Sequence, residues 1–197
     1  TKVTNYTSTY NYDYFYSHTP SVIRNKWDDT NNVLSNNPTQ SLSDLINFAT
    51  QKGTASDGYS WVKANSDLNL SKSSLPSGRK LIVFVEGNLN ITGDITLNEA
   101  NSFLMFMVKG NITLNPSSVT QIEGLYFTGK DFDTGTRGSR QDSQLKVTGS
   151  VVAQNKVYLR RSLPTAQAET TAAEYFTYSP ALFLQIPSVF NQRIFNW

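Results

Sequence analysis

The sequence predicts an all-β protein built as a short right-handed parallel β-helix, a β-solenoid of about four or five coils. The main observation is that two segments, 81–91 and 104–114, superimpose at an offset of 23 residues. Both alternate apolar and polar residues, and both carry a Gly-Asn pair at the same place, ending at Asn88 and at Asn111. Alternation with a period of two puts the apolar residues on one face of an extended chain. A repeat of about 20 residues is typical of solenoids, in which each coil adds one strand to each face.

Further coils are predicted on both sides of these two. Residues 62–70 repeat the pattern 21 residues before 83–91, with Asp67 at the position of Asn88. Downstream, 125–129 matches 106–110 at an offset of 19, and 145–159 alternates again. The residues expected to point inward are Val83, Val85, Leu89, Ile91, Phe106, Val108, Ile112, Leu114, Val147, Val151 and Val157. The alternative is a meander of antiparallel hairpins, but no Asn-Gly or Asp-Gly turn separates the runs.

The 197 residues are long enough for one domain with a proper core. We expect an N-terminal aromatic segment and capping helix over 1–58, the solenoid over 59–160, and a connector with a docking tail over 161–197. The net charge is +2 and only 16% of residues are charged, whereas nucleic-acid binders gather lysine and arginine on one face. We therefore expect no nucleic-acid partner. No run approaches the ~20 apolar residues of a membrane span, and the absence of cysteine excludes disulfides and thiolate ligands.

The N-terminal segment alternates four tyrosines, Tyr10, Tyr12, Tyr14 and Tyr16. In an extended chain this spacing places the four phenols on one face. One interpretation is a surface that stacks on sugars or adheres to a partner. The other, which we favour, is an aromatic strand that lies against the solenoid with its hydroxyls toward water.

Two further segments are expected to pack on the solenoid. Ser41 and Asp44 form a capping-box pattern, apolar residues then follow at helical spacing, and Gly53 stands past the end, so an amphipathic helix is predicted over 41–52. Ser179-Pro180 begins a second short helix, inside a very apolar tail, 176–197. A tail this apolar is expected to pack against the rest of the protein.

A stripe of large apolar side chains is predicted on an outer face of the coils. It comprises Ile82, Phe84, Met105, Met107, Tyr126 and Val152. A monomer rarely leaves such a stripe bare. We expect it to be covered by the 41–52 helix, by the C-terminal tail or by a partner, and with the four tyrosines it forms the candidate interaction surface.

The segment 131–142 is a polar insertion that holds Asp131, Asp133 and Asp142. Its first residues resemble the beginning of a calcium loop, but the further ligands of such a loop do not follow at the right spacing. We expect a solvated loop with locally paired charges and no cofactor, and these aspartates are the candidate ligands should calcium bind. Asn88 and Asn111 are expected to form a side-chain ladder at one corner of successive coils.

The chain also resembles a known family over roughly Tyr59 to Trp197. The resemblance lies in the Gly-Asn segments that begin at Gly87 and Gly110, the Gly-Leu-Tyr-Phe strand from Gly124, the strand from Gln144, and the tail that begins Ala173-Glu-Tyr-Phe-Thr-Tyr-Ser-Pro. It is similar to the β-helical C-terminal region of uncharacterised surface or type IV pilus-associated proteins of candidate-phylum bacteria. The resemblance implies an extracellular, cell-anchored and non-enzymatic role, with other surface or pilus components as partners. It supplies no catalytic residues.

The sequence leaves two other functions open. A carbohydrate-binding or adhesin module would take glycans as partners. A polysaccharide-acting enzyme would need paired carboxylates that converge on one outer face, and no acid pair stacks between the coils. We therefore expect a non-catalytic scaffold at the cell surface.

Overall fold

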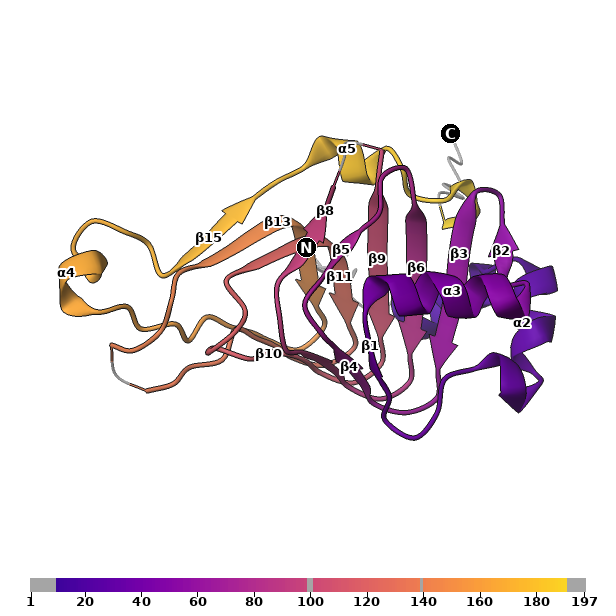
Figure 1. Cartoon of the computed structure of the whole chain (residues 1–197), viewed down its shortest axis with the longest axis horizontal. Helices are drawn as coiled ribbons and strands as arrows, with labels where there is room; N and C mark the ends of the chain where they lie inside the picture. The colour runs from indigo at the N-terminus through magenta and orange to yellow at the C-terminus, as the bar shows by residue number, and fades with distance from the viewer. Residues whose placement is uncertain (1–9, 99–100, 139, 191–197) are drawn as a thin grey trace, which may run out of the picture.

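The protein is a β-solenoid of about four turns with few helices, as seen in a computed structural model that describes residues 10–98, 101–138 and 140–190. The strands stand side by side along the molecule, with α2 and α3 near one end and α4 at the opposite end (Figure 1). The helices are α1 Tyr12–His18, α2 Ser21–Trp27, α3 Leu42–Lys52, α4 Thr165–Ala168 and α5 Pro180–Phe183, with the 3-10 turns η2 Thr30–Asn32 and η3 Ser188–Phe190.

Two parallel sheets form the main faces. Sheet A joins β15 Glu174–Thr177, β13 Leu145–Ala153, β11 Gln121–Thr128, β9 Phe103–Val108, β6 Lys80–Val85, β3 Tyr59–Ala64 and the antiparallel β2 Ala55–Ser56. Sheet B joins β1 Thr39–Gln40, β4 Leu68–Leu70, β7 Leu89–Ile91, β10 Ile112–Leu114, β12 Phe132–Asp133 and β14 Val157–Tyr158. A short third face pairs β5 Ser73–Leu75 with β8 Ile95–Leu97, which also joins the start of β11.

The interior is a column of apolar side chains, and it confirms the register predicted for the central coils. Every predicted inward residue from Val83 to Leu114 is completely buried, and Val147 is 1% exposed. The last coil differs, because Val151 is only half-buried and Val157 is 45% exposed. Val157 follows the inward-pointing Phe132 in register, as predicted, but it is not buried in the core.

The register predicted for β11 is also wrong by one residue. Leu125 pairs with Met105 and Tyr126 pairs with Phe106, so the offset between these coils is 20 residues and not 19. Tyr126 points into the interior, where its ring stacks on Phe106 with a centroid distance of 5.6 Å. Leu125 and Phe127 occupy the outer positions instead.

The N-terminal aromatic segment is helical, so the prediction of an extended strand with four phenols on one face is wrong. α1 begins after Asn11, whose side chain accepts a hydrogen bond from the Tyr14 amide at 2.8 Å. Because a helix brings residues four apart together, Tyr12 stacks with Tyr16 on the buried side while Tyr14 meets Tyr10.

The first coil is closed by α3. Ser41 and Asp44 form a capping box, and Gly53 ends the helix in the left-handed conformation at φ 63°. Leu42, Leu45 and Ala49 are completely buried in the interior cluster, and the helix contacts β1, β3 and β5. It therefore covers an end of the solenoid and not the outer stripe.

Candidate functional site

The outer stripe lies on sheet A and consists of Ile82, Phe84, Met105, Met107, Leu125 and Phe127. Their register places Ile82, Met105 and Leu125 in one row and the other three in a second row. Val152 continues the second row beside Phe127 but is 47% exposed. The stripe thus exists as predicted, except that Leu125 and Phe127 replace Tyr126.

Helices α1 and α2 cover part of the stripe, with contacts to Phe84 and Phe127 of the second row. The rings of Tyr12 and Trp27 each lie 5.6 Å from the ring of Phe84, and Phe15 lies 5.3 Å from Phe127. The sequence predicts that the aromatic segment lies against the solenoid, but as a strand and not over this stripe, because alternate tyrosines suit a strand as well as a short helix. The Asn11 cap is the signal that favours the helix.

The C-terminal segment covers another part of the stripe. Leu182 and Phe190 are buried in the same cluster as the stripe, and the ring of Phe190 lies 5.8 Å from that of Trp61. The remainder of the predicted tail, 191–197, lies outside the described residues.

An apolar groove of about 460 Å³ remains between α1, sheet A and the C-terminal segment. Its lining residues are Tyr10, Phe15, Met105, Met107, Leu125, Tyr126, Phe127, Ser150, Val152, Phe183, Ile186 and Phe190. Of the four candidate tyrosines, only Tyr10 lines it, and Tyr12 lies on the buried side of α1.

The predicted asparagine ladder is present and confirmed. The Asn111 side chain and backbone amide donate to Asn88 Oδ1 at 3.2 and 2.9 Å. Asn88 donates in the same way to Asp67 Oδ1 at 3.1 and 2.7 Å, and the Asp131 amide donates to Asn111 Oδ1 at 3.2 Å. The residue before each asparagine is glycine because space is lacking: a Cβ at Gly110 would lie 2.5 Å from Asn88 Oδ1.

The three candidate calcium ligands do not converge. Asp131 belongs to the ladder and accepts from Asn155 Nδ2 at 2.7 Å. Asp133 accepts from the Gly135 amide at 2.9 Å and lies 3.4 Å from Arg160. Asp142 is separate from both. Within the described ranges, no group of three or more His, Cys, Asp or Glu side chains is placed to hold a metal ion.

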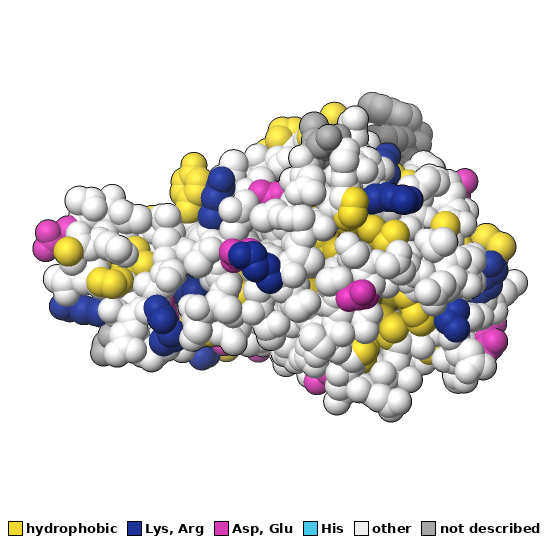
Figure 2. Space-filling view, in the orientation of Figure 1, with side chains coloured by type: hydrophobic (Ala, Val, Ile, Leu, Met, Phe, Trp, Pro, Cys, Tyr) yellow, Lys and Arg dark blue, Asp and Glu magenta, His cyan; other side chains and the backbone are white. Residues whose placement is uncertain are grey.

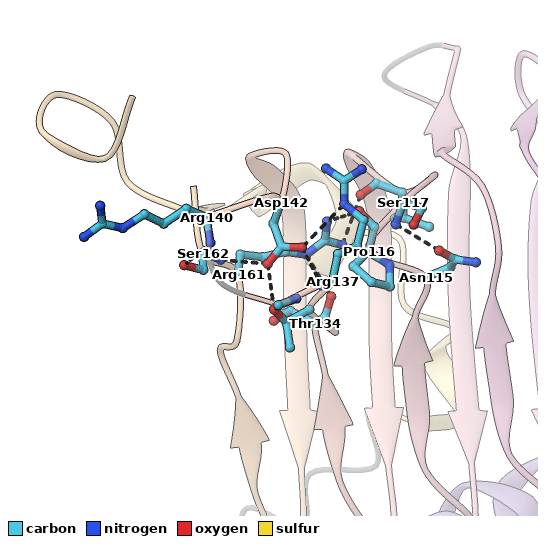
Figure 3. Close-up of polar contacts among 12 residues, drawn as sticks. Asn115, Pro116, Ser117, Thr134, Arg137, Arg140, Asp142, Arg161 and Ser162 are labelled. Atoms are coloured by element: carbon cyan, nitrogen blue, oxygen red, sulfur yellow. Dashed lines mark hydrogen bonds and ion pairs between the residues drawn. The ribbon is translucent and has the colours of Figure 1, made fainter. Parts of the chain in front are cut away.

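Asp142 lies instead in a buried polar cluster at the end of the insertion (Figure 3). It is 2% exposed and accepts from the amides of Arg137 and Ser162 at 2.7 and 2.8 Å and from the Thr136 hydroxyl at 2.8 Å. Burial alone would raise the pKa of Asp142. The two amides, the hydroxyl and the charge of Arg161 outweigh that effect and hold the pKa below its usual value.

Arg161 is the cation of this cluster and is 6% exposed. Its guanidinium donates to the carbonyl oxygens of Thr134, Pro116 and Val119 at 2.8, 3.0 and 3.1 Å. Burial lowers the pKa of Arg161, and the nearby carboxylates of Asp142 and Glu174 oppose that shift. The side chain therefore ties the 116–119 turn to Thr134 of the insertion.

Most described carboxylates likewise serve the backbone. Those that accept a hydrogen bond from a main-chain amide are Asp29, Asp44, Asp67, Asp94, Asp133, Asp142, Glu123 and Glu174. Asp94, for example, accepts from the amides of Thr120 and Gln121 at 2.6 and 3.0 Å, which joins successive coils. These carboxylates act as acceptors that fix turns and coil spacing.

The outer face of sheet B is a second surface with a regular chemistry. Its outward positions are Asn69, Asn90, Thr113, Asp133 and Tyr158, one per coil. Asn90 donates to Asn69 Oδ1 at 3.1 Å, and the Arg160 guanidinium lies 4.8 Å from the Tyr158 ring. Figure 2 shows a face made mainly of backbone and of side chains that are neither charged nor hydrophobic, with hydrophobic, basic and acidic side chains among them.

Among the described residues, no helix combines the length and the apolar character needed to cross a membrane. Comparison of the chain with protein-family models, with curated proteins and with solved structures gave no match.

Proposed function

We propose that this chain is a non-catalytic structural domain of an extracellular, cell-surface or pilus-associated protein. The observation that carries the proposal is the use of its carboxylates as acceptors for main-chain amides. A polysaccharide-acting enzyme needs two carboxylates that face one substrate and exchange protons with it. Here Asp67, Asp94 and Asp142 instead hold neighbouring segments of the coil together.

The finer features of the fold belong to the same proposal. We take the coils to wind in the right-handed sense, which parallel crossovers strongly prefer. We also take the 41–52 helix as the permanent cap of the first coil and the apolar tail as docked on sheet A. Ladders such as Asp67–Asn88–Asn111 join each coil to the next, and this favours a stiff spacer that holds other parts of an assembly apart.

The location is supported by the resemblance to surface and pilus-associated proteins and by an outer face made mainly of backbone and of side chains that are neither charged nor hydrophobic. Antibodies raised against the domain provide the test, by immunogold labelling of intact and permeabilised cells that produce the protein. Labelling of intact cells is expected. Labelling that requires permeabilisation overturns the extracellular placement.

The non-catalytic part has its own test. The protein is incubated with a panel of acidic and neutral polysaccharides, and reducing ends and unsaturated products are measured. No product above the blank is expected. Product formation that disappears in an Asp142→Asn or Asp94→Asn variant of unchanged fold refutes the proposal.

A carbohydrate-binding module is the second candidate, and the outer face of sheet B favours it. Amide, hydroxyl and carboxylate groups recur there on successive strands about 4.8 Å apart, with Tyr158 at one end of the row. A glycan array with the wild-type protein and with Asn90→Ala and Tyr158→Ala variants tests this candidate. Tyr175→Ala, at an exposed tyrosine away from the row, is the matched control. Binding that all three variants retain excludes this face.

A further inference from the structure

The two ends of the solenoid differ in how their apolar interior is covered. α3 closes the first coil, where Leu42 and Leu45 are completely buried. In the last coil the inward positions are open: Val157 follows the fully buried Phe132 in register and is 45% exposed, and Phe176 follows the buried Val147 and is 44% exposed. The interior column therefore ends in a half-exposed apolar layer, Val157 and Phe176, at its C-terminal end.

The open end also presents free sheet edges. β14 and β15 are the last strands of sheets B and A, and each pairs on one side only among the described residues. Leu159, Tyr175 and Tyr178 around these edges are 56%, 53% and 63% exposed. An apolar core beside unpaired strand edges is a surface that readily pairs with another β-structure.

We propose that a second copy of this chain covers the open end, with the C-terminal ends of the two solenoids in contact across a two-fold axis. A head-to-tail filament is disfavoured because α3 blocks the N-terminal end. A two-fold contact uses the same surface on both copies and closes as a dimer. With the axis normal to sheet A, β15 of one copy lies antiparallel to β15 of the other, and sheet A continues across the contact.

The area and charge of the end suit such a dimer. A large aromatic or aliphatic side chain exposes roughly 150–250 Å² when free, so five residues about half exposed offer roughly 500 Å² per copy. Complete burial of these side chains gives a total of roughly 1,000 Å², which is the lower bound for a specific interface. The acidic residue of β15 is Glu174. Its carboxylate accepts hydrogen bonds from the Arg161 amide and the Thr134 hydroxyl at 2.7 and 3.0 Å, so it already has partners within its own chain.

The first test is the mass of the full chain in solution, measured by sedimentation over a range of micromolar concentrations. We expect a dimer of twice 22.0 kDa. A Val157→Asp/Phe176→Asp double variant places a charge in each half of the contact and should raise the dimer dissociation constant roughly 100-fold or more. The matched control is Val22→Asp, at a 54% exposed position on α2, which should remain dimeric.

The second test does not depend on the stability of the double variant. The chain has no cysteine, so a single Tyr175→Cys variant can form only intermolecular cross-links with a short bismaleimide. We expect covalent dimers from Tyr175→Cys and none from Val22→Cys. A wild-type protein that is monomeric throughout the range, or a dimer that the double variant leaves intact, overturns the proposal; in the first case another protein covers the end.

Discussion

Replacing Arg161 with methionine removes a buried cation but keeps much of its apolar stem. Three main-chain carbonyls, those of Pro116, Val119 and Thr134, then lose their donor. A buried polar group left unpaired costs about 1–3 kcal/mol, and partial access of water near the end of the solenoid reduces the sum. We expect Arg161→Met to lower the free energy of unfolding by about 3–5 kcal/mol, the range for breaking a buried ionic cluster.

The neighbouring arginine provides the matched control. The side chain of Arg160 is 49% exposed and its ion pair with Asp133 is 3.4 Å long, so Arg160→Met should cost about 0–1 kcal/mol. Urea unfolding followed by the fluorescence of the buried Trp61 and Trp27 measures both variants. Equal losses for the two arginines would refute the view that Arg161 holds the 116–119 turn to the insertion.

Three further outcomes are expected. Ile112→Ala should lower the free energy of unfolding by about 2–5 kcal/mol, because it truncates a completely buried side chain; a loss below about 1 kcal/mol would mean that the interior is loosely packed. Asn111→Ala should cost about 1–2 kcal/mol in a thermal melt, since the Asp131 amide loses its acceptor, whereas the exposed Asn98→Ala should change little. The pKa of Asp142 is lowered in the folded state, so its stabilisation is present above the ordinary aspartate value of about 3.9 and is lost as the pH falls through the folded pKa. Asp142→Asn should therefore flatten the acid limb of stability against pH, and an unchanged limb would contradict the assignment.

The central coils were predictable because their signals agree. In 81–91 and 104–114 the alternation and the Gly-Asn pair give one alignment, and the buried interior from Val83 to Leu114 follows it. The sequence of β11 does not alternate between apolar and polar residues in this way. Leu125, Tyr126 and Phe127 are all large and apolar, so alternation cannot tell the inner face from the outer, and aligning Gly129 with Gly110 shifted the strand by one residue.

Two parts of the site were beyond sequence reasoning for a different reason. Arg161 binds carbonyls 27 to 45 residues away. Because every residue has a main-chain carbonyl, the sequence cannot indicate which ones accept these bonds. The cover of the outer stripe by α1 depends on tertiary contacts of Tyr12 with Phe84. The spacing of the tyrosines alone fits a strand or a helix equally well.

The ladder at the Gly-Asn corner also sets how this architecture can lengthen. An asparagine both donates to the rung before it and accepts from the rung after it, as Asn88 does between Asp67 and Asn111. An aspartate lacks the side-chain donor, so Asp67 contributes its carboxylate as an acceptor, and at Asp131 the main-chain amide is what donates to Asn111. The block from Asn88 to Gly110 therefore begins and ends at equivalent corners. Tandem duplication of this block would add one coil whose corner already matches its neighbours, so the length of the rod can change in whole coils while both ends stay the same.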